Sequence, residues 1–306
     1  MSITRREFVT SAAAGLLASR LAWAADKTQL PLAFSTLGCP NWELSKILEF
    51  AKANGFAAVE LRGLLGSLDL PSRPEFAADQ IAQTKLKITS SGIKIACVSS
   101  STELHIADPA KRAAGIADGK RFIDLAEQLG APYVRVFGNK FEGGTREEVI
   151  ARVSAGMQEM AEYSGPRGVT VIIESHGDFV DSPTLKEVLE GAKSQYVGLL
   201  WDAHHTFVDG HEQPAQTVAE LGKWIRHTHL KDSVADGSGR KYVLTGKGEV
   251  PVKAQVEALQ RIGYKGYYCF EWEKVWHADL LEPEVAFPQY VEVMTGYLAQ
   301  VRPTRY

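Results

Sequence analysis

Short apolar runs alternate with longer segments whose apolar residues recur at helical spacing, from Leu30 to the C-terminus. This alternation is the signature of repeated strand–helix units. Most of the short runs are almost continuously apolar, as parallel strands covered on both faces require. Eight strands are predicted, at residues 32–35, 58–61, 95–99, 133–137, 169–174, 197–202, 225–230 and 267–271.

A helix is predicted after each strand, and several of these helices end at a glycine. The eight predicted helices cover residues 42–53, 77–91, 111–129, 146–163, 182–192, 214–221, 252–262 and 284–300. Eight such units over roughly 270 residues predict a single-domain (β/α)₈ barrel. A doubly wound open sheet is the alternative, but residues 35–40 offer one glycine and a proline where a dinucleotide site needs spaced glycines.

The long connection at residues 231–251 is polar and rich in glycine. It is expected to be a loop on the catalytic face of the barrel and a candidate substrate lid, because binding residues concentrate on long loops.

The last four predicted strands end in ionisable residues. Strands five, six and eight run into Glu174, Asp202 and Glu271, and strand seven presents His227 and His229. The active site of a barrel lies at the C-terminal ends of its strands. One divalent cation would offset the desolvation cost of all three carboxylates together, whereas four unrelated polar residues in solvated loops is a poor alternative.

The sequence therefore predicts one metal ion held by Glu174, Asp202, His229 and Glu271. Three carboxylates and an imidazole form a hard, oxygen-rich set. Mn²⁺ is the expected ion, while Mg²⁺, Co²⁺ and Zn²⁺ stay open.

Short motifs at these strand ends resemble the xylose isomerase-like barrel superfamily, in its sugar phosphate isomerase/epimerase branch. The resemblance covers the chain after its first segment. The motifs are Glu-Ser-His at 174–176, Trp-Asp-Ala-His-His at 201–205, His-Thr-His-Leu-Lys-Asp at 227–232, Gly-Lys-Gly-Glu-Val at 246–250 and Phe-Glu-Trp-Glu at 270–273.

The resemblance implies that Glu174 and Glu271 are both metal ligands and catalytic groups facing the reacting carbon. It also implies a substrate contact for His205, at the Asp-x-x-His position, and for Lys231 in the His-Leu-Lys-Asp run. Further candidates for substrate binding stand at or beyond strand ends: His176, which shares the face of Glu174, and also Glu60, His105 and Arg240.

Two departures from the family bear on the reaction. Ketose 3-epimerases of the family carry a second glutamate and an arginine at positions that here are Val180 and Ala235. Asp178 and Arg240 are the nearest replacements and are out of register. The extra histidines of the endonuclease IV branch are missing, and a net charge of −3 gives no electrostatic footprint for nucleic acid.

Three functions follow as hypotheses. The first is isomerisation or epimerisation of a free sugar or related hydroxy-ketone by metal-assisted proton transfer through an enediolate. The second is a lyase or dehydratase that acts on a keto-sugar or 3-keto-glycoside. The third is a sugar-binding barrel without catalysis, in which a broken metal set would be expected. A homo-oligomer stays open.

The first residues resemble a twin-arginine export signal. Arg5 and Arg6 precede a small apolar run and an Ala-Trp-Ala site at 22–24. The expectation is a signal at residues 1–24, recognised by the Tat translocase, and a barrel at residues 25–306 in the periplasm. The alternative is an amphipathic first helix; the run is too short for stable membrane insertion.

Overall fold

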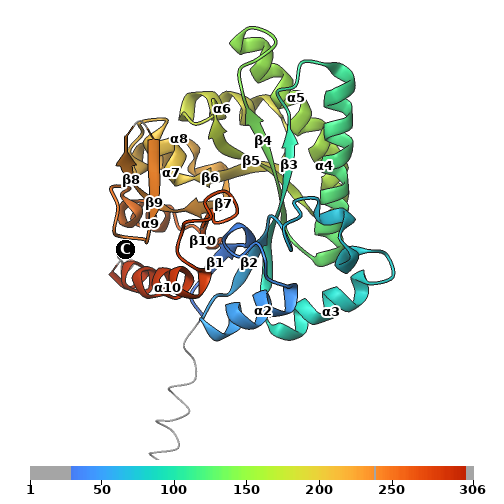
Figure 1. The fold of residues 1–306 in the computed structure, drawn as a ribbon. Helices are drawn as coiled ribbons and strands as arrows, with labels where there is room; N and C mark the ends of the chain where they lie inside the picture. The colour runs from blue at the N-terminus through green and yellow to red at the C-terminus, as the bar shows by residue number, and fades with distance from the viewer. Residues whose placement is uncertain (1–28, 238, 301–306) are drawn as a thin grey trace, which may run out of the picture. The chain divides into compact units, whose positions relative to one another are not determined.

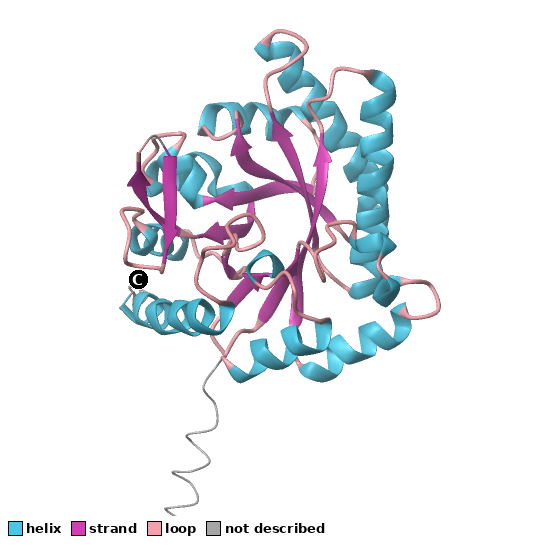
Figure 2. Ribbon diagram, in the orientation of Figure 1, coloured by secondary structure: helices cyan, strands magenta, loops and turns pink. Residues whose placement is uncertain are grey.

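A closed barrel of eight parallel strands forms the centre of the protein. The computed structural model describes residues 29–237 and 239–300, and the expected export signal at 1–24 lies outside them. The strands are β1 (Leu32–Ser35), β2 (Ala58–Leu61), β3 (Lys94–Glu103), β4 (Tyr133–Asn139), β5 (Thr170–Gly177), β6 (Val197–Asp202), β7 (Ile225–Leu230) and β10 (Tyr268–Phe270). Figure 1 shows them inside a ring of helices, and Figure 2 separates the two kinds of element by colour.

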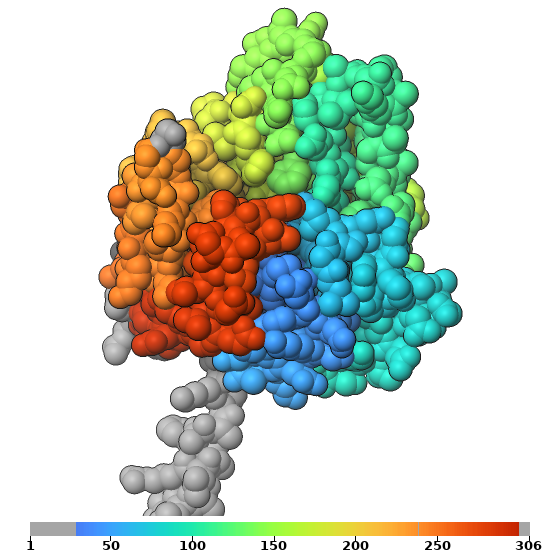
Figure 3. Space-filling view, in the orientation of Figure 1, coloured from blue at the N-terminus to red at the C-terminus, as the bar shows by residue number. Residues whose placement is uncertain are grey.

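The ring closes because β1 pairs in parallel with both β2 and β10. The first and last strands of the barrel are therefore neighbours, and the segments around them touch in the space-filling view, blue beside red (Figure 3). The order around the ring is β1-β10-β7-β6-β5-β4-β3-β2. This confirms the predicted (β/α)₈ barrel and excludes the open sheet.

The helices cover the barrel, and their starts follow the local sequence. They are α2 (Leu44–Ala53), α3 (Ile81–Ser91), α4 (Pro109–Leu129), α5 (Arg146–Ser164), α6 (Ser182–Gly191), α8 (Pro214–Leu221), α9 (Val252–Arg261) and α10 (Pro283–Gln300), with a short α7 (Ala203–Val208). Helix α4 begins two residues before its predicted start because the Asp108 side chain accepts a hydrogen bond from the Lys111 backbone, with Pro109 in the first turn.

A short helix and a two-stranded hairpin were not predicted. Helix α7 follows β6 directly, with the Asp202 side chain capping its N-terminus. Within the segment predicted to be a loop, β8 (Asp232–Asp236) and β9 (Gly239–Val243) form an antiparallel hairpin. The Asp232 carboxylate accepts hydrogen bonds from the backbone of Ser233, Gly246, Gly248 and Val250, so one buried acid holds the base of the hairpin to the following turn.

The three cysteines, Cys39, Cys97 and Cys269, are free thiols and all three are buried. Among the described residues, no helix combines the length and apolar character needed to cross a membrane.

Candidate metal centre

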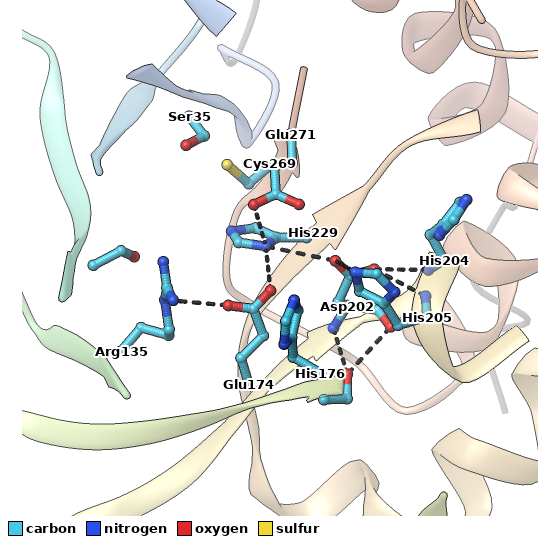
Figure 4. Close-up of polar contacts among 12 residues, drawn as sticks. Ser35, Arg135, Glu174, His176, Asp202, His204, His205, His229, Cys269 and Glu271 are labelled. Atoms are coloured by element: carbon cyan, nitrogen blue, oxygen red, sulfur yellow. Dashed lines mark hydrogen bonds and ion pairs between the residues drawn. The ribbon is translucent and has the colours of Figure 1, made fainter. Parts of the chain in front are cut away.

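The ends of β5, β6 and β7 and the residue after β10 bring four side chains together (Figure 4). The Nδ1 atom of His229 lies 3.3 Å from Glu174 Oε1, 3.8 Å from Asp202 Oδ2 and 3.1 Å from Glu271 Oε1. The register contributes directly, because Asp202 on β6 pairs with His229 on β7. The predicted set therefore meets in space.

These four side chains fit a divalent cation. One ligand atom from each lies within 4.8 Å of all the others, and all four residues are buried. An ion with oxygen and nitrogen ligands at about 2.0–2.2 Å holds its ligand atoms at such separations. Three carboxylates and one imidazole also match the ligand preferences of Mn²⁺, Mg²⁺, Co²⁺ and Zn²⁺.

Glu60 fixes which nitrogen of His229 faces this centre. The carboxylate of Glu60 accepts a hydrogen bond from His229 Nε2 at 2.7 Å, so Nδ1 is the atom left to bind a cation. Its Oε2 atom also accepts from His227 Nε2 at 2.8 Å, and its Oε1 atom accepts from the Ser35 hydroxyl. A carboxylate behind a ligand histidine is the usual device for setting the histidine tautomer and orientation.

The charged groups of the centre shift one another's pKa values. Burial alone would raise the pKa of Glu174, but the charges of Arg135 and His229 lower it to about 2. Burial would lower the pKa of His229, yet Glu271, Glu60 and Glu174 raise it well above its ordinary value. The imidazole therefore holds a proton firmly when no cation competes, and cation binding is expected to release it.

Lys231 lies among the carboxylates at the edge of the centre. Its ammonium donates hydrogen bonds to Asp202 Oδ2 at 2.8 Å, to Glu271 Oε2, and to Glu273 Oε1 at 2.6 Å. Burial opposes its charge, but the three acids raise its pKa well above the usual range. Lys231 is thus a permanently charged group beside the candidate metal ligands.

Two other clusters of possible ligands overlap this one. Glu60, His227, His229 and Cys269 form one, and Asp202, His204 and His205 form the other. In the first, Glu60 Oε2 already accepts two hydrogen bonds, and burial raises the pKa of the Cys269 thiol well above its ordinary value. In the second, His204 Nε2 shares a hydrogen bond with Ser233, and His205 Nδ1 bonds Asp209.

A cavity of about 420 Å³ opens above these side chains, lined by Leu37, Arg62, Arg135, Phe137, Glu174, His176, His205, Lys231, Tyr242, Glu271, Glu273 and Trp276. The structure thus brings both candidate catalytic glutamates to one cavity, together with three of the candidate substrate ligands. Tyr242 reaches it from β9, so the predicted lid contributes one wall.

Three of the residues predicted to bind substrate lie elsewhere. Glu60 is fully buried behind His229, and His105 is buried beside Glu103. Arg240 pairs with Glu249 and with Ser233 within the hairpin region. None of the three lines the cavity. Of the two tryptophans that follow β10, Trp272 is buried and donates its indole N–H to the Leu281 carbonyl, while Trp276 is half exposed at the cavity.

Sequence reasoning missed two arginines of this cavity. Arg135 interrupts the apolar run of β4, and Arg62 follows β2 two residues after Glu60. A charged residue in the middle of an otherwise apolar barrel strand was the available signal, because such a side chain must find a partner inside the barrel.

The placement of Glu60 leads to a quantitative prediction. Glu60→Gln keeps the shape of the side chain but removes the charge that holds His229 and His227. We expect the affinity for a divalent cation to fall by about 10- to 100-fold, the usual effect of losing such a partner. Calorimetric titration with Mn²⁺ measures it, and Ser35→Ala, which removes only the hydroxyl on the other oxygen, should change the affinity far less.

The sequence matches a known family. A family profile described as a xylose isomerase-like TIM barrel matches residues 48–295. The chain belongs to this family. No curated protein sequence gives a significant match to the chain.

Solved structures share the fold at low sequence identity. The IOLI protein with a bound zinc atom is 18% identical with a TM-score of 0.75, over 90% of this chain and 100% of that one. D-psicose 3-epimerase from Clostridium cellulolyticum H10 is 17% identical with a TM-score of 0.71, over 89% and 100%. A probable 3-DHS dehydratase, AsbF, from Bacillus anthracis is 16% identical with a TM-score of 0.70, over 87% and 99%.

Proposed function

We propose that the protein is a divalent-metal-dependent enzyme that transfers a proton at the carbon next to a carbonyl, and so isomerises or epimerises a small hydroxy-ketone. One observation carries this proposal: the carboxylates of Glu174 and Glu271 lie 3.3 Å and 3.1 Å from His229 Nδ1, and both residues line the same cavity. Bases on two sides of one carbon are what an inversion through an enediolate needs.

Each side chain then has a defined task. A cation held by Glu174, Asp202, His229 and Glu271 would supply Lewis-acid polarisation of the substrate carbonyl. One glutamate removes the proton from the adjacent carbon, and the other returns a proton on the opposite face. Lys231 holds Glu271 and Asp202 by hydrogen bonds and presents its charge to a substrate oxygen at the cavity.

A matching lyase reaction is the second candidate. The same enolate would expel a leaving group from the next carbon, giving a lyase or dehydratase acting on a keto-sugar or 3-keto-glycoside. The observation that favours it concerns two side chains, Arg240 and Trp276. Arg240 is engaged with Glu249 instead of facing the cavity, and half-exposed Trp276 offers an apolar surface for a larger leaving group.

Incubation with candidate substrates in D₂O separates these functions. Metal-loaded protein is mixed with free ketoses and with keto-glycosides, and the products are followed by proton NMR. Deuterium at the carbon next to the carbonyl, without bond cleavage, supports the isomerase, whereas a released alcohol or water supports the lyase. Binding of a sugar with neither change would overturn both and leave a binding protein.

Metal loading is also expected to stabilise the fold, because the cation binds side chains that are brought together only in the folded chain. At a free concentration 100 times the dissociation constant, the gain is about 2.7 kcal/mol, which corresponds to an increase in Tm of several degrees. Thermal melts with EDTA and with Mn²⁺, Mg²⁺, Co²⁺ or Zn²⁺ measure the shift. Asp202→Asn should lose most of it, and an equal shift in that variant would contradict the assigned site.

A further inference from the structure

Arg62 is a buried cation without an acidic partner. Its side chain is only 6% exposed, and its Nη2 atom donates a hydrogen bond to the neutral hydroxyl of Ser101 at 2.9 Å. Its Nη1 atom is buried and has no acceptor among the described residues. Across residues 29–237 and 239–300, no carboxylate forms an ion pair with it. Arginine is rarely buried without a paired charge, because the desolvation cost is then uncompensated.

Arg135 is partly paired. It is 1% exposed, its Nε atom lies 3.1 Å from Glu174 Oε2, and its guanidinium stacks on the Phe137 ring at 3.9 Å. The other oxygen of Glu174 faces His229, so this carboxylate is shared between two cationic groups. The Nη1 atom of Arg135 is also buried without an acceptor.

Both guanidinium groups line the cavity that holds Glu174 and Glu271. Burial, and then repulsion by the nearby charge of Arg135, lower the pKa of Arg62 to about 9, so Arg62 is still charged at neutral pH. An anion placed between the two guanidinium groups would pair with the charge of Arg62 and accept hydrogen bonds from the Nη1 atoms of Arg62 and Arg135. It would also reduce the electrostatic repulsion between the two arginines.

We propose that the substrate carries a carboxylate, held by Arg62 and Arg135, and that the enzyme therefore acts on a keto-acid form of a sugar. This inference rests on the proposed function, because it places the carbonyl carbon of the same molecule at Glu174 and Glu271. A carboxylate is planar with two acceptor oxygens and matches the fork of a guanidinium. A phosphate ester offers the same charge chemistry and is distinguished by the experiment.

The test compares three six-carbon probes that differ in one group: D-gluconate, D-glucitol and D-glucitol 6-phosphate. Each is titrated calorimetrically into the metal-loaded full-length protein, so no turnover is needed. We expect gluconate to bind at least about tenfold more tightly than the other two probes. This difference in affinity corresponds to the free energy of one charge-assisted hydrogen bond. Equal affinities, or tighter binding of the phosphate ester, would overturn the proposal.

Variants identify the group that binds the carboxylate. Arg62→Met should abolish the preference for gluconate, whereas Arg261→Gln, on the outside of α9, should keep it. Gluconate can also bind a cation directly through its carboxylate. If Arg62→Met keeps the full preference for gluconate, that preference does not come from Arg62 and the proposal is overturned. Arg62→Lys serves as a second variant if Arg62→Met unfolds: it keeps the charge but loses the fork, so an intermediate preference is expected, and a preference equal to that of the unmodified protein would count against the proposal.

Failure of this inference is separable from failure of the proposed function. Selective gluconate binding in a protein that exchanges no deuterium into any ketose or keto-acid sugar contradicts the enzyme and leaves the anion site standing. Deuterium exchange on neutral ketoses, without a preference among the three probes, contradicts the anion site alone.

Discussion

Glu271→Gln is expected to lower the rate of proton exchange at the substrate carbon by about a thousandfold, within the usual range for a positioned general base. Glutamine keeps the size of the side chain but cannot accept the proton. The change also removes one negative charge from the metal centre, where Glu271 Oε1 lies 3.1 Å from His229 Nδ1. The rate is therefore measured by NMR in D₂O at saturating Mn²⁺, with the bound metal counted in the same sample.

Two comparisons define the role of Glu271. Glu257→Gln, on the outer helix α9, is a charge-matched control and should keep the full rate. In Glu174→Gln the second carboxylate is lost, so interconversion of the two epimers should stop as well. If each glutamate serves one face, each variant will still exchange deuterium into the one epimer whose proton the remaining glutamate removes, and the large loss of rate will be confined to the other epimer. A metal-loaded Glu271→Gln protein with nearly full activity would remove Glu271 from the mechanism.

The fold and the four clustered ligands could be predicted from sequence because topology brings them together. Doubly covered parallel strands are apolar along their whole length, so the residue at which polarity returns marks the strand end. In a barrel all such ends meet at one rim. Glu174, Asp202 and Glu271 each follow a buried apolar run, and their convergence in space is a consequence of strand order.

What was missed depends on contacts between distant segments. The roles of Glu60 and His227 follow from a hydrogen bond between β2 and β7, 167 residues apart in sequence, and no local pattern encodes that pairing. Hairpin β8–β9 lies in a glycine-rich polar stretch with weak strand propensity, and Asp232 organises its base through backbone contacts. Arg135 is a single charge within the apolar run of β4, and the local sequence does not identify its partner, Glu174 on β5.

Lys231→Met is expected to lower the stability of the fold in the absence of metal and to raise the affinity for a divalent cation. The Lys231 ammonium contacts three acids, of which Asp202 and Glu271 are buried and Glu273 is partly exposed. Methionine fills a similar volume but removes this cationic partner from all three carboxylates. Removing one partner of a buried ion pair costs about 3–5 kcal/mol, which corresponds to a fall in Tm on the order of 10 °C. Thermal melts in EDTA measure it, with Lys253→Met on α9 as the exposed-lysine control.

The same substitution should strengthen cation binding. The Lys231 ammonium contacts Asp202 Oδ2, which faces the centre, and the second oxygen of Glu271, so it repels any cation held by these residues. Without it, the carboxylates bind a divalent ion more tightly, and the rise in Tm on adding Mn²⁺ should be larger in Lys231→Met than in the unmodified protein. A smaller rise in Tm would mean that Lys231 supports the metal site by orienting the carboxylates that it contacts. Charge repulsion between the ammonium and the cation would then be the weaker effect.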